Sequence, residues 1–178
     1  MGKRITRQPP RYHDDFSIYF LTFCTYQRKP FLHEKDIHKL IISNLEYYGK
    51  RLTDLIAYTI MPDHIHLLVE VEKSGTISDF LRDFKKHTSK EITTHLNEKI
   101  THVWQRGTMD HCIRFSWTGK DFDNHLQYLF SNSWKHLQIP PKDFPYHNFK
   151  DIVERGWLEE DFLVNVDPQF PLGKIYDP

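Results

Sequence analysis

The 178-residue sequence predicts an α+β fold, a ferredoxin-like split βαβ arrangement in which helices pack on one antiparallel sheet. Three observations predict it. Apolar residues recur at helical spacing in three segments. Short runs rich in aromatic and β-branched residues, which are typical of strands, lie between these segments. The elements follow one another in the order β-α-β-β-α-β-α, which is the order expected for such a sheet.

The first half of the chain supplies three strands and one helix. Residues 16–26 are rich in aromatic and β-branched residues and predict a strand, and Pro30 ends this run. A helix should follow and end at Gly49, because one face of it collects Ile37, Leu40, Ile41, Leu45 and Tyr48. Two further strands are expected over residues 55–60 and 64–71, and residues 61–63 form the turn between them.

The second half of the chain predicts two helices and one strand. A long helix is expected over roughly residues 77–97, with an inner face formed by Ile77, Phe80, Leu81 and Phe84. Residues 103–115 should be extended. A third helix is expected over residues 121–137, and Pro140 and Pro141 end it. The sequence has no repeat and no Gly/Ser linker, so we expect one domain over residues 1–140 and a C-terminal extension over residues 141–178.

The composition excludes several classes of protein. Aromatic residues make up 15% of the chain, too many for an unfolded segment. No apolar run approaches the ~20 residues that span a bilayer, so we expect no membrane contact. The N-terminus lacks the apolar stretch of a secretion signal, and two cysteines, Cys24 and Cys112, cannot form a disulfide framework. These features predict a cytoplasmic protein.

Charge is distributed unevenly along the chain. Lysines plus arginines and acids number 24 each, so the net charge is zero. Residues 151–178 hold seven acids and two bases, a net charge of −5, and the first 150 residues therefore carry +5. The bases of this part include Lys3, Arg4, Arg7, Arg11, Arg82, Lys85, Lys86 and Lys90. They are either a solvated surface or a phosphate-binding face, and charge alone does not decide between the two.

A pair of histidines begins the strand expected after residue 63. Residues i and i+2 of a strand point to the same face, so His64 and His66 project together. Two imidazoles held in this way supply two of the three protein ligands of a typical open site for a divalent ion. The alternative is a pair of half-exposed histidines bonded to their neighbours. The apolar strand around the pair and the preceding Pro62-Asp63 turn favour the metal site.

A second polar group lies on the third predicted helix. Asn124, Tyr128, Asn132 and Lys135 are spaced by 4, 4 and 3 residues and therefore share one face. Tyr128 could supply a phenolic nucleophile, and Asn132 an amide-oxygen ligand for the same ion. A tyrosine with its usual pKa near 10 needs help from a base or a metal to attack at neutral pH. Alternatively, Tyr128 is one of nine tyrosines and packs against the sheet.

In their order and spacing these motifs resemble the HUH single-tyrosine transposases of bacteria, and more specifically the REP-associated tyrosine transposase branch. The resemblance rests on the histidine pair after Met61-Pro62-Asp63 and on Tyr128 four residues before Asn132. It extends to residues 19–25, 81–90, 104–107, 110–114, 132–136 and 146–157. The sequence departs from the family at Ser133 and Leu137, where proline and glycine are frequent.

The resemblance implies an enzyme, a DNA transposase whose catalytic domain is residues 1–140. Mg²⁺ or Mn²⁺ would be held by His64, His66 and Asn132, and Tyr128 would cut one DNA strand beside a palindromic hairpin through a 5′-phosphotyrosine link. The protein would be a nucleoid-associated homodimer. Candidate phosphate contacts are Lys3, Arg4, Arg7, Arg11, Arg82, Lys85, Lys86, Lys90 and Lys135.

Two other functions remain open from the sequence. One is a non-catalytic DNA-hairpin-binding protein of the same fold. The other is a small Zn²⁺ hydrolase that uses His64, His66 and a carboxylate with water as the nucleophile, and it would not need Tyr128.

Overall fold

Four strands form one antiparallel sheet in the order β2-β3-β1-β4 in the computed structural model, which describes residues 16–73, 76–97, 100–113 and 120–165. The strands are β1 (Ser17–Cys24), β2 (Asp54–Ile60), β3 (His64–Val71) and β4 (Met109–Cys112). The helices are α1 (Lys35–Gly49), α2 (Thr76–Leu96), α3 (Lys120–Leu137), α4 (Phe149–Glu154) and α5 (Phe162–Asn165). Strand order, antiparallel pairing and element order confirm the predicted ferredoxin-like α+β fold.

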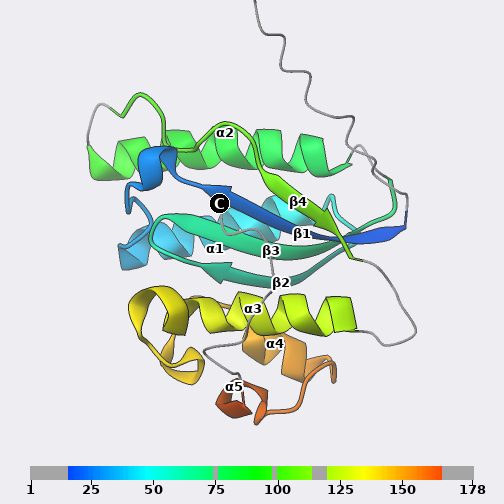
Figure 1. The fold of residues 1–178 in the computed structure, drawn as a ribbon. Helices are drawn as coiled ribbons and strands as arrows, with labels where there is room; N and C mark the ends of the chain where they lie inside the picture. The colour runs from blue at the N-terminus through cyan, green and yellow to red at the C-terminus, as the bar shows by residue number, and fades with distance from the viewer. Residues whose placement is uncertain (1–15, 74–75, 98–99, 114–119, 166–178) are drawn as a thin grey trace, which may run out of the picture.

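Helices cover both faces of the sheet (Figure 1). Successive side chains of β1 point to opposite faces of the sheet and pack against different helices. Leu21 and Phe23 point to the face covered by α1 and α2, whereas Phe20 points to the face covered by α3. Two hydrophobic cores therefore lie on opposite sides of the sheet, and any polar side chain that β1 or β3 turns toward α3 is enclosed between the sheet and that helix.

The predicted elements agree with the structure except in one strand. β3 begins and ends where the sequence predicts, α1 ends at Gly49 as predicted, and α2 and α3 differ from their predicted ranges by at most one residue at either end. Of the extended segment expected over residues 103–115, residues 114–115 lie outside the described residues, and among the rest only Met109–Cys112 pairs with β1 as a strand. Gly107, with a φ of 86°, interrupts the extended backbone, and Trp104 makes only an isolated bridge to Thr25.

The segment after residue 140 packs onto the outer strand β2. The side chain of Asn148 accepts a hydrogen bond from the backbone N–H of Tyr58 at 2.8 Å and donates one to the carbonyl of Ile56 at 3.1 Å. The backbone N–H of Ile60 donates to the carbonyl of Tyr146 at 2.9 Å. These bonds cover part of an edge that would otherwise present unpaired backbone groups. Phe149, Ile152 and Leu163 join the core beneath α3.

Among the helices that the structure describes, none has both the length and the apolar character needed to cross a membrane.

The predicted boundary between a domain over residues 1–140 and a C-terminal extension over residues 141–178 stays a prediction.

Candidate functional site

The histidine pair lies between the sheet and α3. In the register of the two central strands, His66 is opposite Thr22 and His64 is opposite Cys24. Both histidines share one face of the strand, as the i, i+2 spacing predicts, and this face is covered by α3. Their exposed fractions are 2% for His64 and 0% for His66. The structure therefore does not show the half-exposed strand histidines of the alternative interpretation.

Both ring nitrogens of His66 have partners. Nδ1 lies 2.8 Å from the hydroxyl of Thr22, and Nε2 lies 3.1 Å from Oδ1 of Asn132. An amide oxygen only accepts, so Nε2 carries the proton here and Nδ1 accepts from the Thr22 hydroxyl. Burial, with the nearby charge of His64, lowers the pKa of His66 well below its usual value. The ring is therefore neutral, the form in which imidazole binds metals.

His64 is oriented by the turn residue before it. Its Nδ1 donates to Oδ1 of Asp63 at 2.6 Å, which leaves Nε2 as the nitrogen that can bind an ion. Burial alone would raise the pKa of Asp63, but the hydrogen bonds and charges of His64 and Arg28 outweigh it and hold that pKa below its usual value. Arg28 reaches the other carboxylate oxygen at 3.2 Å. Asp63 thus fixes the histidine tautomer.

Helix α3 brings the tyrosine and the asparagine to these histidines. The Nδ2 of Asn132 donates to the carbonyl of Tyr128 one turn earlier at 2.7 Å, and this bond turns Oδ1 toward His66. The ring centroid of Tyr128 lies 5.1 Å from that of His66, and only 2% of Tyr128 is exposed. Lys135 Nζ is 5.5 Å from the Tyr128 ring centroid, while Asn124 is half-buried a turn earlier. Tyr128, Asn132 and Lys135, three of the four residues predicted to share this face, therefore lie close together beside His66.

The donor atoms fit a divalent ion. His64 and His66 stand with their ring centroids 4.8 Å apart, and the amide oxygen of Asn132 is directed at the second ring. Two imidazole nitrogens and one amide oxygen form a mixed set. Between the two predicted ions this set suits Mn²⁺ better than Mg²⁺, because Mg²⁺ takes oxygen ligands almost throughout.

Two residues of this region are not among the predicted site residues. His136 is exposed on α3 one turn after Asn132, and its ring centroid lies 5.3 Å from that of His64. The i+4 spacing from Asn132 is the sequence signal that could have found it. Thr22, the partner of His66, has no such signal, because its position opposite that histidine depends on the pairing of β1 with β3.

The predicted basic residues of α2 lie in the helix layer on the other side of the sheet from Tyr128 (Figure 1). Arg82 forms ion pairs with Asp79 at 2.7 Å and Asp83 at 2.9 Å. Lys85 donates to the carbonyl of Gly107 at 2.6 Å. Lys86 is exposed. Lys3, Arg4, Arg7 and Arg11 lie outside the described residues.

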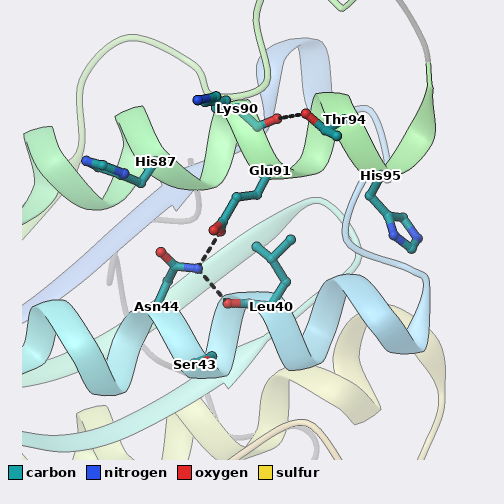
Figure 2. Close-up of a pocket in the computed structure, with 8 residues that line it drawn as sticks. All are labelled: Leu40, Ser43, Asn44, His87, Lys90, Glu91, Thr94 and His95. Carbon is teal, nitrogen blue, oxygen red and sulfur yellow. Dashed lines mark hydrogen bonds between the residues drawn. The ribbon is translucent and has the colours of Figure 1, made fainter.

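Lys90 lines a groove of about 580 Å³ between α1 and α2 (Figure 2). Asn44 bridges the two helices there, because its Nδ2 donates to Oε2 of Glu91 at 2.7 Å and to the carbonyl of Leu40 at 2.9 Å. His87 and His95 also line the groove. The groove thus holds an acid as well as bases and is separate from the tyrosine site. Of the predicted DNA-binding residues that the structure describes, Lys135 is the one beside Tyr128.

Comparison with known proteins identifies the family. The profile of the family described as "Transposase IS200 like" matches residues 16–131, which include His64, His66 and Tyr128. A Haemophilus influenzae protein whose name assigns it to the REP-associated tyrosine transposases is 28% identical over 172 residues, 88% of this chain and 94% of that protein.

A solved structure has the same fold. It is a REP-associated tyrosine transposase bound to a REP hairpin, with a TM-score of 0.69 and 21% identity over 86% of this chain and 88% of that one. The resemblance to the REP-associated branch, inferred from the motifs, is thereby confirmed. Since the family profile spans all four strands and most of α3, the chain belongs to the IS200-like transposase family.

Proposed function

We propose that this transposase is a metal-dependent single-stranded DNA endonuclease and strand transferase that cuts beside DNA hairpins through a 5′-phosphotyrosine intermediate. The observation that carries the proposal is the convergence of Tyr128 and Asn132, from one face of α3, on His66 of β3. The proposed nucleophile and the proposed metal ligands thus come from two elements of the fold. A tyrosine that served packing alone would not require this set of neighbours.

In the proposed reaction the phenolic oxygen of Tyr128 attacks the scissile phosphorus in line. A bond forms between that oxygen and phosphorus, and the bond from phosphorus to the 3′ oxygen breaks. The phenol releases one proton and the departing 3′ oxygen takes one up, so the step is balanced. Attack of another 3′-hydroxyl on the phosphotyrosine reverses the chemistry and joins strands without ATP, because the covalent link keeps the energy of the phosphodiester.

His64, His66 and Asn132 would hold the ion. A bound Mn²⁺ or Mg²⁺ supplies polarisation of the phosphate and stabilises the charge that develops on its oxygens. Neighbouring side chains set the tautomers of the two histidines that would bind the ion. Asp63 keeps the proton of His64 on Nδ1. Thr22 can donate as well as accept, so its hydroxyl stays bonded to His66 when the proton of that ring moves from Nε2 to Nδ1.

The burial of Tyr128 sets a condition on the reaction. With 2% of the residue exposed, a DNA strand reaches the phenol only if side chains around the C-terminal half of α3 move. This end of the helix is suited to receive the strand. Lys135 and His136 are exposed and basic, and Trp134 is 39% exposed, so it offers a ring on which an unpaired base can stack.

The DNA partner is proposed by similarity. The solved relative is bound to a REP hairpin, and the same kind of palindromic hairpin is the substrate that we propose here. Arg82, Lys85, Lys86, Lys90 and Lys135 would contact its phosphates, as would Lys3, Arg4, Arg7 and Arg11. A homodimer and association with the nucleoid remain predictions.

The test uses a labelled DNA hairpin with single-stranded flanks, taken from beside the gene, together with Mn²⁺. We expect a retarded complex on a native gel, and on a denaturing gel a nicked product and a protein-linked product. Binding with no nick and no adduct would favour the hairpin-binding alternative. Multiple turnover with no adduct would favour hydrolysis by a metal-activated water.

A further inference from the structure

A second group of metal-ligating side chains lies on the same side of the sheet. His111 of β4 and Asp121 and His125 of α3 each offer one ligand atom, and these atoms all lie within 4.8 Å of one another. The group shares no residue with the set formed by His64, His66 and Asn132. Phe20 stands between the two, since its ring centroid is 5.3 Å from that of His66 and 4.9 Å from that of His125.

The distances within this group approach those of a metal centre. Oδ2 of Asp121 is 3.1 Å from Nε2 of His111, and Oδ1 of Asp121 is 3.3 Å from Nδ1 of His125. In a tetrahedral zinc site with bonds of about 2.0–2.1 Å, ligand atoms lie roughly 3.3–3.4 Å apart. The two histidine rings are stacked with centroids 4.7 Å apart. The two distances involve different carboxylate oxygens, so the three ligand atoms, which lie within 4.8 Å of one another, must draw closer to occupy three corners of the tetrahedron.

The burial of the three side chains differs in a way that suits an open site. The side chain of His125 is 1% exposed, whereas those of His111 and Asp121 are 32% and 26% exposed, so an ion can enter from their side. Nδ1 of His125 also lies 2.6 Å from the backbone carbonyl of Asp121, while its Nε2 is buried with no hydrogen-bond partner among the described residues. A carbonyl only accepts, so Nδ1 carries the proton here, and an ion that binds this nitrogen must displace the bond to the carbonyl while the proton moves to Nε2.

We propose that His111, Asp121 and His125 bind a divalent transition-metal ion of the zinc class at a site separate from that of Tyr128. Two imidazole nitrogens and one carboxylate oxygen are the donors that such ions prefer, and a water completes the shell. The ion ties the edge strand β4 to the first turns of α3. His125 precedes Tyr128 by three residues, so the ion steadies the helix that positions the tyrosine. This proposal does not depend on the DNA chemistry proposed above.

The test is a titration of the full chain with Co²⁺, whose visible absorption reports each site it fills. His111→Ala removes one ligand. Asp121→Asn keeps the size and shape of the side chain but replaces the charged carboxylate with a neutral amide, which is not among the usual donors of zinc-class ions. The matched controls are His87→Ala and Asp123→Asn, exposed residues outside the group. Because even the loss of a residue that only orients a ligand weakens metal binding by about 10–100-fold, we expect each ligand variant to lose at least about 100-fold in affinity for one ion.

The number of ions distinguishes this site from that of the tyrosine. We expect two Co²⁺ ions in the wild type and in both controls, and one in His111→Ala and in Asp121→Asn. One ion in the wild type and none in His111→Ala would support this site and remove the metal from the tyrosine site. If both ligand variants bind as much Co²⁺ as the wild type and as tightly, the proposal is wrong. Should His111→Ala not fold, as judged by circular dichroism, Asp121→Asn decides.

Discussion

Nε2 of His66 lies 3.1 Å from Oδ1 of Asn132, and this contact joins a central strand of the sheet to the helix that carries Tyr128. The same amide donates to the carbonyl of Tyr128, so Asn132 is bonded to both sides of the site. Asn132 is fully buried, with 0% exposure, so water cannot take the place of either hydrogen-bond partner. The asparagine therefore holds the site together in addition to its proposed role as a metal ligand.

Asn132→Ala should impair both folding and cleavage. The substitution leaves Nε2 of His66 buried without its acceptor, which should lower the free energy of unfolding by about 1–3 kcal/mol. Urea denaturation measures this loss. Asn132→Asp keeps an oxygen at the same place and should retain Mn²⁺ binding. Normal Mn²⁺-dependent cleavage by Asn132→Ala would show that the amide is not a ligand.

Removal of either histidine should abolish metal-dependent cleavage. His64→Ala and His66→Ala each delete one of the two imidazole donors, so neither variant should nick hairpin DNA in Mn²⁺, and wild-type protein in EDTA should behave in the same way. Mn²⁺ should support more activity than Mg²⁺ because of the mixed nitrogen and oxygen donors. His87→Ala, an exposed histidine on α2, is the control. Full activity in EDTA would exclude the proposed ion.

Stability should fall as the pH drops below about 6.5, and His38 should account for part of the fall. Burial lowers the pKa of His38 to about 4, against an ordinary value of 6.5. Between these values the unfolded chain binds a proton that the folded chain does not, so the free energy of unfolding decreases from pH 6.5 toward pH 4. The ring of His38 stacks on Tyr146 with centroids 3.4 Å apart.

His38→Phe keeps a flat ring on Tyr146 and removes the titration. Its free energy of unfolding should therefore depend less on pH over this window than that of the wild type, as measured by urea denaturation at several pH values. The exposed His87→Gln serves for comparison. An identical pH dependence in His38→Phe and the wild type would assign the effect to other histidines.

The salt dependence of binding should test whether Lys86 of α2 contacts DNA. Lys86 is exposed, whereas Lys85 donates to the carbonyl of Gly107 and to the hydroxyl of Thr108. If Lys86 contacts a phosphate, Lys86→Gln should reduce the slope of log K against log salt by about 0.7–0.9. Lys39→Gln, which removes a lysine paired with Asp36 on α1, should leave the slope unchanged. A wild-type slope in Lys86→Gln would make this lysine part of the solvated surface.

Local patterns in the sequence predicted most of the fold. Helical periodicity located α1, α2 and α3, and the i, i+2 and i, i+4 spacings placed His64 with His66 and Tyr128 with Asn132. The contact between these two pairs depends on α3 crossing β3, which no local spacing encodes. The motifs of the family supplied that link.

Long-range pairing explains what the sequence could not predict. Thr22 reaches His66 only through the register of β1 and β3, and Asn148 completes the edge of β2 from 90 residues away in the chain. The same reason applies to His111, which meets Asp121 and His125 only because β4 pairs with β1 at the edge of the sheet.

The most direct test of the proposed chemistry is the removal of one oxygen. Tyr128→Phe keeps the ring beside His66 and deletes the phenol, so hairpin binding should persist while the nick and the covalent adduct disappear from a denaturing gel run with Mn²⁺. Tyr48→Phe, another buried tyrosine but one on α1, should still form both products. An adduct of undiminished yield in Tyr128→Phe would contradict the assignment of Tyr128 as the nucleophile.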